Sequence, residues 1–504
     1  MFNKIGLGRW HILPILVAFL NQAASPSQLI SSVFTNMPLD FRLVALSSNT
    51  STYDNICIGT NHTHSNVSDS EIEFDHTDFE STFTSEFQLV CSEDWISDLY
   101  QLSITVGLAI GSLLGGIGDK WGRLPVIRFG ALGCLLGVTM VGFGPNVYIV
   151  LVGRLVIGLF WNILNVSSLT LAMENTPTPN RSNICLLIMI GYPLSVTLKG
   201  MISYFLRDWR KLHLTLSSFI YLIVVLSYFL DKSLRWLFHN GHFEEGTVLL
   251  EKMLKLHNSN KTLADFLPII NGWKSKFNLE EIHKKSEKNL CVLLKNNITI
   301  FFKNPAMVSI SLTTPIIWFI TGLVYFGVPL NANNFTDNPF IYMVFLGVTE
   351  VISIILGGII LKRFGNIRTG AVCFTITGGC LLLILTVPEY VWWLKWILIL
   401  LAMMSISICY ALCYILSSEL YPTEVKSAGL GICNFFIFIG FSLSSLLSKI
   451  ALRYSNWIFN VVCSAFCFIA VVLMIFLLPE TKGEALCDTT DDVAERSKRL
   501  RNKK

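Results

Sequence analysis

Ionisable side chains inside long apolar runs are the residues of this 504-residue chain with the chemistry to bind an ion. Glu350 lies about 16 Å into the apolar run 340–361, close to its midpoint, at about 1.5 Å per helical residue. Arg154 and Lys199 lie inside two other runs. A charge in the lipid interior costs a few kcal/mol, so it is retained where it pairs, faces water or binds a ligand. We therefore expect Glu350 to contact or gate a cationic substrate, with a structural ion pair to Arg154 or Lys199 as the alternative.

Polar and aromatic side chains on neighbouring runs would complete such a site. Asn21, Ser25, Gln28 and Ser32 recur at helical spacing and form one stripe of the first run. Polar groups avoid lipid, so this stripe should face a water-filled cavity or another helix, and nearby Pro26 favours the cavity. Aromatic faces attract organic cations, with lipid contact or core packing as the alternative for each single ring. The other candidates for substrate contact are Asn162, Asn165, Trp318, Tyr410, Tyr414 and Phe438, with Trp161, Tyr325 and Phe435 as further aromatics.

The elements that position these residues are membrane-spanning helices. Only 14% of the residues are charged and the mean hydropathy is +0.57, whereas soluble domains carry about 25% charged residues. The apolar residues form about twelve runs of roughly 20 residues, the length that crosses the hydrocarbon core as a helix. We therefore predict an all-α integral membrane protein. The predicted spans are 11–33, 98–117, 124–143, 146–170, 183–205, 212–230, 306–330, 340–361, 369–388, 392–416, 428–450 and 456–478.

The hydrophilic segments differ in charge and predict the orientation. Residues 35–97 hold one basic residue, Arg42, among many carboxylates, whereas residues 231–300 and the tail 481–504 are rich in Lys and Arg. By the positive-inside rule the basic segments and both termini are cytoplasmic, and residues 35–97 are extracellular. A cleaved signal peptide ending near Ala23 is the alternative for the first run, but its removal would leave an odd number of spans. The tail is a solvated topology signal or a contact for anionic lipid.

The acidic loop carries further signs of an extracellular position. Two cysteines of the chain, Cys57 and Cys91, fall in it, and an oxidising exterior favours a disulfide between them. Its histidines His62, His64 and His76 are candidate metal ligands, but we expect no metal site. Sequons for N-glycosylation occur at Asn49, Asn61 and Asn66 in this loop and at Asn334 in a short external loop.

A charged, glycine-rich loop at residues 115–123 (GGIGDKWGR) joins the second and third runs. Small residues let helices approach closely in lipid, so Gly111, Gly115 and Gly118 predict a tight helix contact. Asp119 and Arg123 then lie at the membrane surface, where they can pair with charges or helix ends. The loop resembles the Gly-x-x-x-Asp-Arg-x-Gly-Arg-Arg loop of the major facilitator superfamily, with departures at Lys120 and Leu124.

Further motifs occur in the order typical of one branch of that superfamily. They are residues 85–91 (SEFQLVC), 209–210 (WR), 235–237 (RWL), 419–423 (ELYPT) and 478–483 (LPETKG). Together they resemble the organic cation and anion transporter family of solute carriers over nearly the whole chain. The resemblance implies two six-helix halves, with a small organic ion bound between them near the midplane.

The same resemblance implies a division of the chain and a set of switch residues. The segments are 1–34 (N-terminus and first helix), 35–97 (external loop), 98–230 (helices two to six), 231–300 (central cytoplasmic loop), 301–480 (second half) and 481–504 (tail). The expected conformational-switch residues are Gly115, Asp119, Gly122, Arg123, Arg154, Glu174, Arg181, Arg235, Glu419, Lys426 and Glu480.

Several positions depart from the family pattern. The family's Pro-Glu-Ser-Pro-Arg after the sixth helix is DKSLR here (residues 231–235), so that Lys232 reverses a charge, and Asn366 replaces an acid in the second-half loop 362–366 (KRFGN). Phe438 stands where cation-carrying relatives have an acid and anion-carrying relatives an arginine. The charge preference therefore rests on Glu350 and the aromatics, which lean toward cations or zwitterions.

These observations predict a plasma-membrane transporter that works by alternating access as a uniporter or exchanger. The lost loop charges motivate an alternative, a non-transporting membrane sensor or scaffold derived from such a carrier. No phosphate-binding loop or catalytic motif is present, so we expect neither ATP, a cofactor nor enzymatic activity. The basic tail is too short to argue for nucleic acid. The expected partners are a small organic ion and the lipid bilayer.

Overall fold

The computed structural model describes most of the chain outside parts of the loops and the two ends. The described residues are 7–37, 39–43, 72–90, 93–115, 117–177, 180–256, 263–268, 270–275, 304–331, 338–422, 426–455, 457–480, 492, 493, 495, 496 and 499. Within these ranges, the side chains of Arg42, Leu43, Asp119, Lys120, Ser182, Lys362, Glu389, Lys426, Ser427, Leu452 and Arg453 are excluded. Asn49, Asn61, Asn66, Asn334, Cys57 and Cys91 lie outside the described residues, so their predicted modifications stay predictions.

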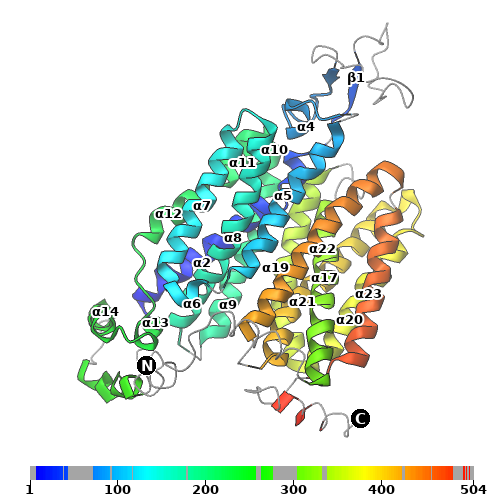
Figure 1. Ribbon diagram of the computed structural model, residues 1–504. Helices are drawn as coiled ribbons and strands as arrows, with labels where there is room; N and C mark the ends of the chain where they lie inside the picture. The colour runs from blue at the N-terminus through cyan, green and yellow to red at the C-terminus, as the bar shows by residue number, and fades with distance from the viewer. Residues whose placement is uncertain are drawn as a thin grey trace.

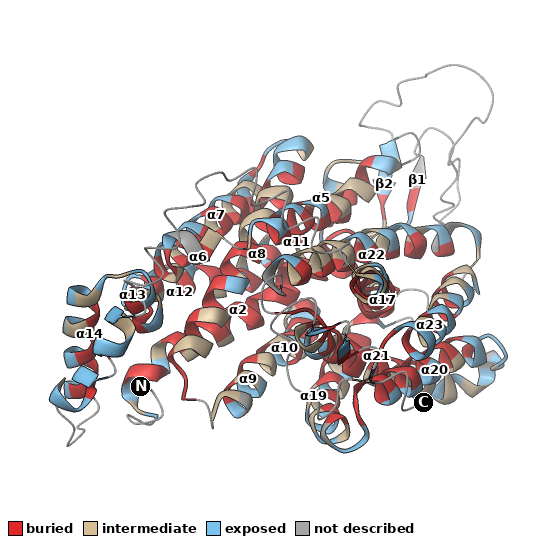
Figure 2. Ribbon diagram, turned by 60° about the horizontal axis from the view of Figure 1, so that its bottom comes forward, coloured by how far each residue is buried: buried red, intermediate tan, exposed pale blue. Residues whose placement is uncertain are grey.

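The long helices form two bundles that lie side by side (Figure 1). The N-terminal half holds α2 (Ile12–Leu29), α5 (Asp94–Leu113), α7 (Arg123–Phe143), α8 (Val147–Asn175), α9 (Arg181–Met189), α10 (Gly191–Phe205), α11 (Trp209–Leu216) and α12 (Ser218–Ser227). The C-terminal half holds α17 (Pro305–Leu330), α19 (Pro339–Phe364), α20 (Asn366–Ile384), α21 (Trp392–Leu420), α22 (Lys426–Tyr454) and α23 (Trp457–Leu477). Figure 2 shows buried residues on the helix faces that meet inside the bundles and exposed residues on their outer faces. The predicted all-α membrane fold is confirmed.

Eleven helical segments of the described chain are long and apolar enough to cross a membrane. α2 is not among them because Asn21, Gln22 and Gln28 lower its hydropathy, yet it is largely buried and packs against α8, α10 and α12. The fifth and sixth predicted spans are each made of two consecutive helices, α9 with α10 and α11 with α12. The sixth span begins at Trp209, three residues before its predicted start, because Asp208 caps α11 by accepting from the backbone N–H of Arg210 and Lys211.

Short elements distinguish the two ends of the bundles. The end that carries the described parts of segment 35–97 is called the loop end here. It holds α3 (Ser32–Thr35), the antiparallel pair β1 (Phe41–Leu43) and β2 (Ile72–Phe74), and α4 (Phe83–Glu86). The opposite end of the bundles, where the two chain ends lie, is called the tail end here (Figure 1). It holds η1 (Arg9–His11), α6 (Ile117–Trp121), α13 (Leu234–His239), α14 (Phe243–Leu256) and η5 (Leu263–Phe266). The short turn η6 (Glu389–Val391) precedes α21.

Glycines bring helix backbones into direct contact within each half. In the N-terminal half, a Cβ built on Gly111 would lie 2.5 Å from the carbonyl oxygen of Leu159, so α5 and α8 touch there. The predicted tight contact is therefore confirmed at Gly111, whereas Gly115 has ordinary contact distances of 3.5 Å or more. In the C-terminal half, Gly322 and Gly440 bring α17 and α22 together in the same way. Such close packing makes each half a firm unit.

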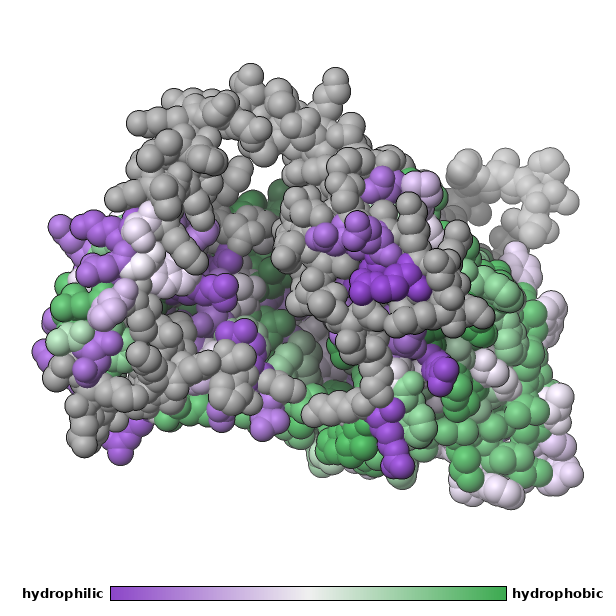
Figure 3. Space-filling view, turned by 90° about the horizontal axis from the view of Figure 1, so that it is seen from below, coloured by the Kyte–Doolittle hydropathy of each residue, from purple (hydrophilic) through white to green (hydrophobic). Residues whose placement is uncertain are grey.

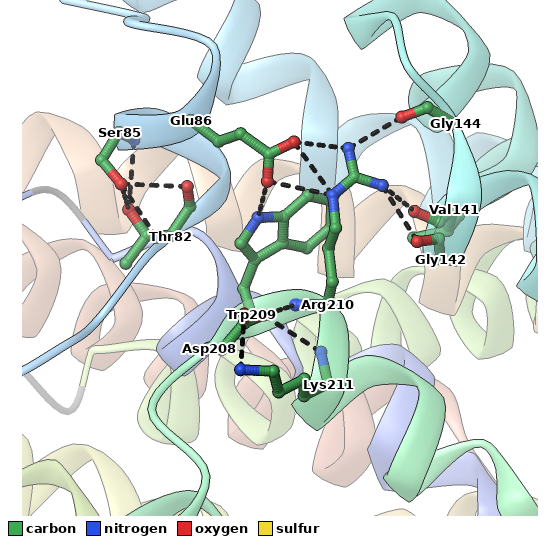
Figure 4. Close-up of polar contacts among 10 residues, drawn as sticks. All are labelled: Thr82, Ser85, Glu86, Val141, Gly142, Gly144, Asp208, Trp209, Arg210 and Lys211. Atoms are coloured by element: carbon green, nitrogen blue, oxygen red, sulfur yellow. Dashed lines mark hydrogen bonds and ion pairs between the residues drawn. The ribbon is translucent and has the colours of Figure 1, made fainter.

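A polar clamp fastens α4 onto the N-terminal half at the loop end (Figure 4). Glu86 receives the Trp209 indole N–H at 2.7 Å and forms an ion pair with Arg210 at 2.6 Å. The same guanidinium donates to the carbonyls of Gly142 at 3.0 Å and Gly144 at 2.7 Å, at the C-terminal end of α7. Three segments far apart in sequence are thus joined by one arginine and one glutamate.

The clamp predicts a stability loss on Glu86→Gln. The neutral amide keeps the size of the side chain but removes the charge-assisted bonds, each worth about 1.5–3 kcal/mol when well formed. We expect a lower melting temperature for the purified protein, measured by thermal unfolding in detergent. The matched control is Glu80→Gln, whose exposed ion pair with Lys211 spans 3.7 Å. Equal melting temperatures for the two variants would contradict the clamp.

Candidate functional site

The two halves meet at the loop end through an ion pair and an aromatic stack. Lys449 Nζ of α22 lies 2.5 Å from Asp98 Oδ1 and 2.5 Å from Ser97 Oγ of α5. Phe340 of α19 stacks on Phe34 of α3 at 5.2 Å between ring centroids, and on Phe79 at 5.7 Å. We call Phe34, Phe79, Asp98, Phe340 and Lys449 the loop-end seal. Lys449, near the C-terminal end of α22, is therefore paired with an acid of the other half.

The tail end has polar networks that stay within each half. In the N-terminal half, Arg123 pairs with Glu174 at 3.0 Å, and the Ser233 hydroxyl donates to Glu174 at 2.6 Å. In the C-terminal half, the Asn366 amide donates to Glu419 at 2.7 Å, and its backbone N–H donates to Glu480 at 2.9 Å. Figure 3, which views this end, shows the surface hollowed between the two halves.

Glu350 of α19 is buried at the boundary between the halves, with 4% of its surface exposed. Its carboxylate accepts a hydrogen bond from the Tyr325 hydroxyl of α17. The Tyr325 ring in turn lies 6.3 Å from the ring of Tyr192, which belongs to α10 of the N-terminal half. Among the described residues, no basic side chain forms an ion pair with Glu350. The alternative prediction, an ion pair of Glu350 with Arg154 or Lys199, is therefore wrong, since all three side chains are described and no such pair forms.

A row of tyrosines leads from Glu350 along the C-terminal half. Tyr325 stacks on Tyr410 of α21 at 4.4 Å, and the Tyr410 and Tyr414 hydroxyls lie 3.5 Å apart. We call Tyr325, Tyr410 and Tyr414 the tyrosine row. Tyr414 is 38% exposed, packs on the buried Trp318 at 4.6 Å and donates to Asn434 of α22 at 3.1 Å. Rings and hydroxyls together can surround an organic cation and orient its polar groups.

The polar stripe of α2 contacts other helices of its own half. Asn21 donates to Asn165 of α8 at 3.0 Å, and Gln28 donates to Ser217 at 2.8 Å. Asn162 donates to the Leu108 carbonyl of α5 at 3.1 Å. These amides therefore hold α2, α5, α8 and the start of α12 together. Asn165 is half-buried, unlike Asn21, Gln28 and Asn162, which are buried.

Arg154 is a buried hub of the N-terminal half. It makes four hydrogen bonds, to the carbonyls of Tyr100 and Gln28, the Ser31 hydroxyl and the Gln101 amide oxygen, at 2.9–3.2 Å. Its guanidinium also lies 4.1 Å from the centroid of the Tyr100 ring. These partners come from α2, α5 and the turn between α2 and α3. Arg154 thus lies inside the bundle, away from the loops in which the other predicted switch residues stand.

The remaining predicted switch residues lie at the tail end with different surroundings. Gly122 has φ +87°, which favours glycine, and lies against the Trp236 ring. Arg181 donates to the Thr176 carbonyl at 3.4 Å, and Arg235 is exposed. The side chains of Asp119 and Lys426 lie outside the described residues. In the tail, Arg496 is buried and donates to the Glu419 carbonyl at 3.1 Å, so the expectation of a wholly solvated tail is corrected at this residue.

Sequence reasoning missed Tyr192, Asn434 and the partner of Lys449. Asp98 and Lys449 stand at the ends of predicted spans on the same side of the membrane, so their opposite charges were a usable signal. Tyr192 and Asn434 carried none beyond their residue type. Phe438 is half-buried, one helical turn before Ser442, whose hydroxyl donates across the halves to Thr105 at 2.7 Å.

Comparisons with known proteins agree with this architecture. Residues 32–492 match the family described as sugar (and other) transporter. Organic anion transporter 3 of Sus scrofa is 26% identical over 430 residues, which cover 84% of this chain and 76% of that protein. Solute carrier family 22 member 3 of Mus musculus is 26% identical, with 82% and 72% covered. Solute carrier family 22 member 27 of Mus musculus is 27% identical, with 88% and 80% covered.

Solved structures show the same fold. The xylose transporter XylE from E. coli in its inward open conformation has a TM-score of 0.66 at 13% identity and covers 96% of this chain and 98% of that chain. XylE bound to 6-bromo-6-deoxy-D-glucose has a TM-score of 0.65 at 15% identity, with 96% and 99% covered. The matched proteins are membrane transporters and not enzymes, as expected. The chain belongs to the sugar (and other) transporter family, and it has the fold of the major facilitator superfamily transporters of known structure.

Proposed function

We propose that this protein carries small organic cations or zwitterions across the plasma membrane by alternating access. The observation that carries the proposal is Glu350, a buried carboxylate at the boundary of the halves that pairs with no described basic residue. A carboxylate at this depth needs a counter-charge, a proton or water. An organic cation held by Glu350 and the tyrosine row supplies the first of these.

The contacts between the halves support alternating access. The loop-end seal joins the halves by few side chains, and the tail-end polar networks lie within each half. Glycine contacts occur within each half and also between the halves, where Gly200 and Gly347 bring α10 and α19 together. Rigid-body rocking therefore breaks few hydrogen bonds and ion pairs and leaves the polar networks of each half intact. With the hollow open at the tail end, this arrangement is one of the two states that such a cycle requires (Figure 3).

The alternative, a sensor without transport, was motivated by lost loop charges. Asn366 replaces an acid of the family pattern, yet its amide and backbone N–H bind two carboxylates, Glu419 and Glu480. At the other departure, Asp231 next to Lys232 pairs with Lys252 at 2.7 Å and accepts from the Trp10 indole at 3.2 Å. Both departures thus retain polar contacts at the tail end. This favours a working carrier over the sensor.

Glu350→Gln tests the proposal directly. The amide keeps the size of the side chain and removes its charge, so we expect at least a tenfold rise in the apparent KM for cations, or loss of their flux. A tenfold change corresponds to about 1.4 kcal/mol. The measurement is uptake of labelled quaternary ammonium ions into vesicles, normalised to the protein at the surface. Glu245→Gln on α14, an exposed acid paired with Lys232, is the control and should carry cations normally.

Two outcomes of that experiment would contradict the proposal. Unchanged cation kinetics in a correctly inserted Glu350→Gln would remove Glu350 from the site. Saturable binding without uptake in the wild-type protein, across a panel of labelled cations and anions, would identify a sensor instead.

The loop-end seal predicts a charge-swap rescue. Lys449→Asp and Asp98→Lys each place like charges opposite one another and should slow transport severalfold, since half-exposed pairs contribute about 1 kcal/mol or less. The double swap restores the attraction and should recover most of the rate, measured as initial uptake per surface molecule. A double variant no faster than either single variant would show that the pair does not link the halves functionally.

The orientation predicts glycans on the loop-end segment. If residues 35–97 are extracellular, glycosidase treatment should increase the gel mobility of the protein expressed in animal cells. Changing Asn49, Asn61 and Asn66 to Gln should abolish the shift, or reduce it to a remainder that disappears when Asn334 is changed as well. A full shift in the fourfold variant would overturn the orientation.

A further inference from the structure

Lys199 of α10 is a buried cation with few partners. Only 1% of its surface is exposed, and its ammonium donates one hydrogen bond, to the Pro26 carbonyl of α2 at 3.2 Å. It also lies 5.8 Å from the centroid of the Phe34 ring. An ammonium has three N–H donors, so two remain without a partner among the described residues. Burying a charge so weakly satisfied costs several kcal/mol.

A structural role accounts for Arg154 but not for Lys199. The four hydrogen bonds of Arg154 join three segments of the N-terminal half, so its burial is compensated. Lys199 joins α10 to α2 through one bond to a carbonyl that also accepts from the backbone N–H of Ile30. No described acid forms an ion pair with Lys199.

The position of Lys199 relates it to the proposed substrate site. Tyr192 and Lys199 are seven residues apart, which places them on one face of α10 and about 10 Å apart along its axis. Tyr192 packs beside Tyr325, the hydrogen-bond partner of Glu350. Lys199 thus lies on the same face of α10 as Tyr192, which borders the site, and two helical turns nearer the loop end than Tyr192.

The loop-end seal covers Lys199 in this state. Phe34, the ring nearest its ammonium, stacks on Phe340 of the other half. Next to Lys199 in sequence, Gly200 contacts the Phe340 carbonyl, with a built Cβ at 2.9 Å. Separation of the halves at this end would part Phe34 from Phe340 and uncover the two spare donors of Lys199.

We propose that Lys199 binds an anionic group of a zwitterionic substrate that enters from the loop end, while Glu350 holds its cationic group. The inference rests on the proposed function and adds the substrate class. A carboxylate accepts charge-assisted bonds from both spare donors, which are stronger than neutral ones. Two opposite charges set about two helical turns apart on the protein favour ligands whose own charges are several bonds apart.

Binding of three matched probes to the full-length protein tests this assignment. The probes are trimethylammonium carboxylates with one to five methylene groups between the charges, the corresponding trimethylammonium alcohols, and simple carboxylates of the same length. We expect Lys199→Gln to weaken the longer zwitterions at least tenfold and to change the alcohols less than twofold. Lys199→Arg keeps the charge and should retain most of the affinity for zwitterions. Ser203→Ala, a buried position one turn further along α10, should leave all three classes unchanged.

Each other outcome overturns the inference. Equal losses for zwitterions and alcohols in Lys199→Gln would assign Lys199 to folding or gating, and unchanged affinities would remove it from the site. If the variants fail to fold, the wild-type protein decides, because zwitterions no tighter than their alcohols at every length contradict a cationic subsite.

The two proposals fail in different ways. Glu350→Gln should weaken the binding of alcohols and zwitterions alike, because both carry the cationic group. Wild-type protein that binds no trimethylammonium alcohol would contradict the proposed cation site. Binding of simple carboxylates that depends on Lys199 would then still support its role toward anions.

Discussion

Every charge placed among lipid-spanning helices must find a partner inside the protein, in water or in a ligand, and this constraint organises the structure. Arg154 meets it with carbonyls, a hydroxyl and an amide of its own half. Glu350 meets it with one tyrosine, and Lys199 with one carbonyl. Arg154, with four hydrogen-bond partners, holds helices together. Glu350 and Lys199 have one partner each, so each can form further hydrogen bonds to a ligand.

The same constraint shapes the division into halves. Within a half, small residues and buried amides bring helix backbones together, as at Gly111 and at Asn21 with Asn165. Between the halves, the loop-end seal relies on aromatic stacking and on an ion pair at the membrane surface. Hydrogen bonds and ion pairs are thus more numerous inside the halves than across them, so the halves can move as bodies at the cost of few polar contacts.

The departure from the family pattern at Asn366 retains polar contacts by other chemistry. Asn366 cannot supply a negative charge, but its amide donates to Glu419 and its backbone N–H to Glu480. Glu86, Trp209 and Arg210 of the clamp belong to family motifs. Their joint contact is seen only in the folded chain, where the C-terminal end of α7 supplies the carbonyls that Arg210 binds.

Hydropathy and charge cost act along the chain, so the sequence by itself determined the spans, the membrane class and the family, and it singled out Glu350 as a candidate. The broken fifth and sixth spans and the polar character of α2 refine these predictions without changing the fold. Helical periodicity places a residue on a face but does not say which helix lies opposite. Only the tertiary structure therefore decided that Gln28 contacts Ser217, that Lys449 pairs with Asp98, and that the tyrosine row ends on Glu350, since each contact joins segments whose proximity depends on packing of the whole bundle.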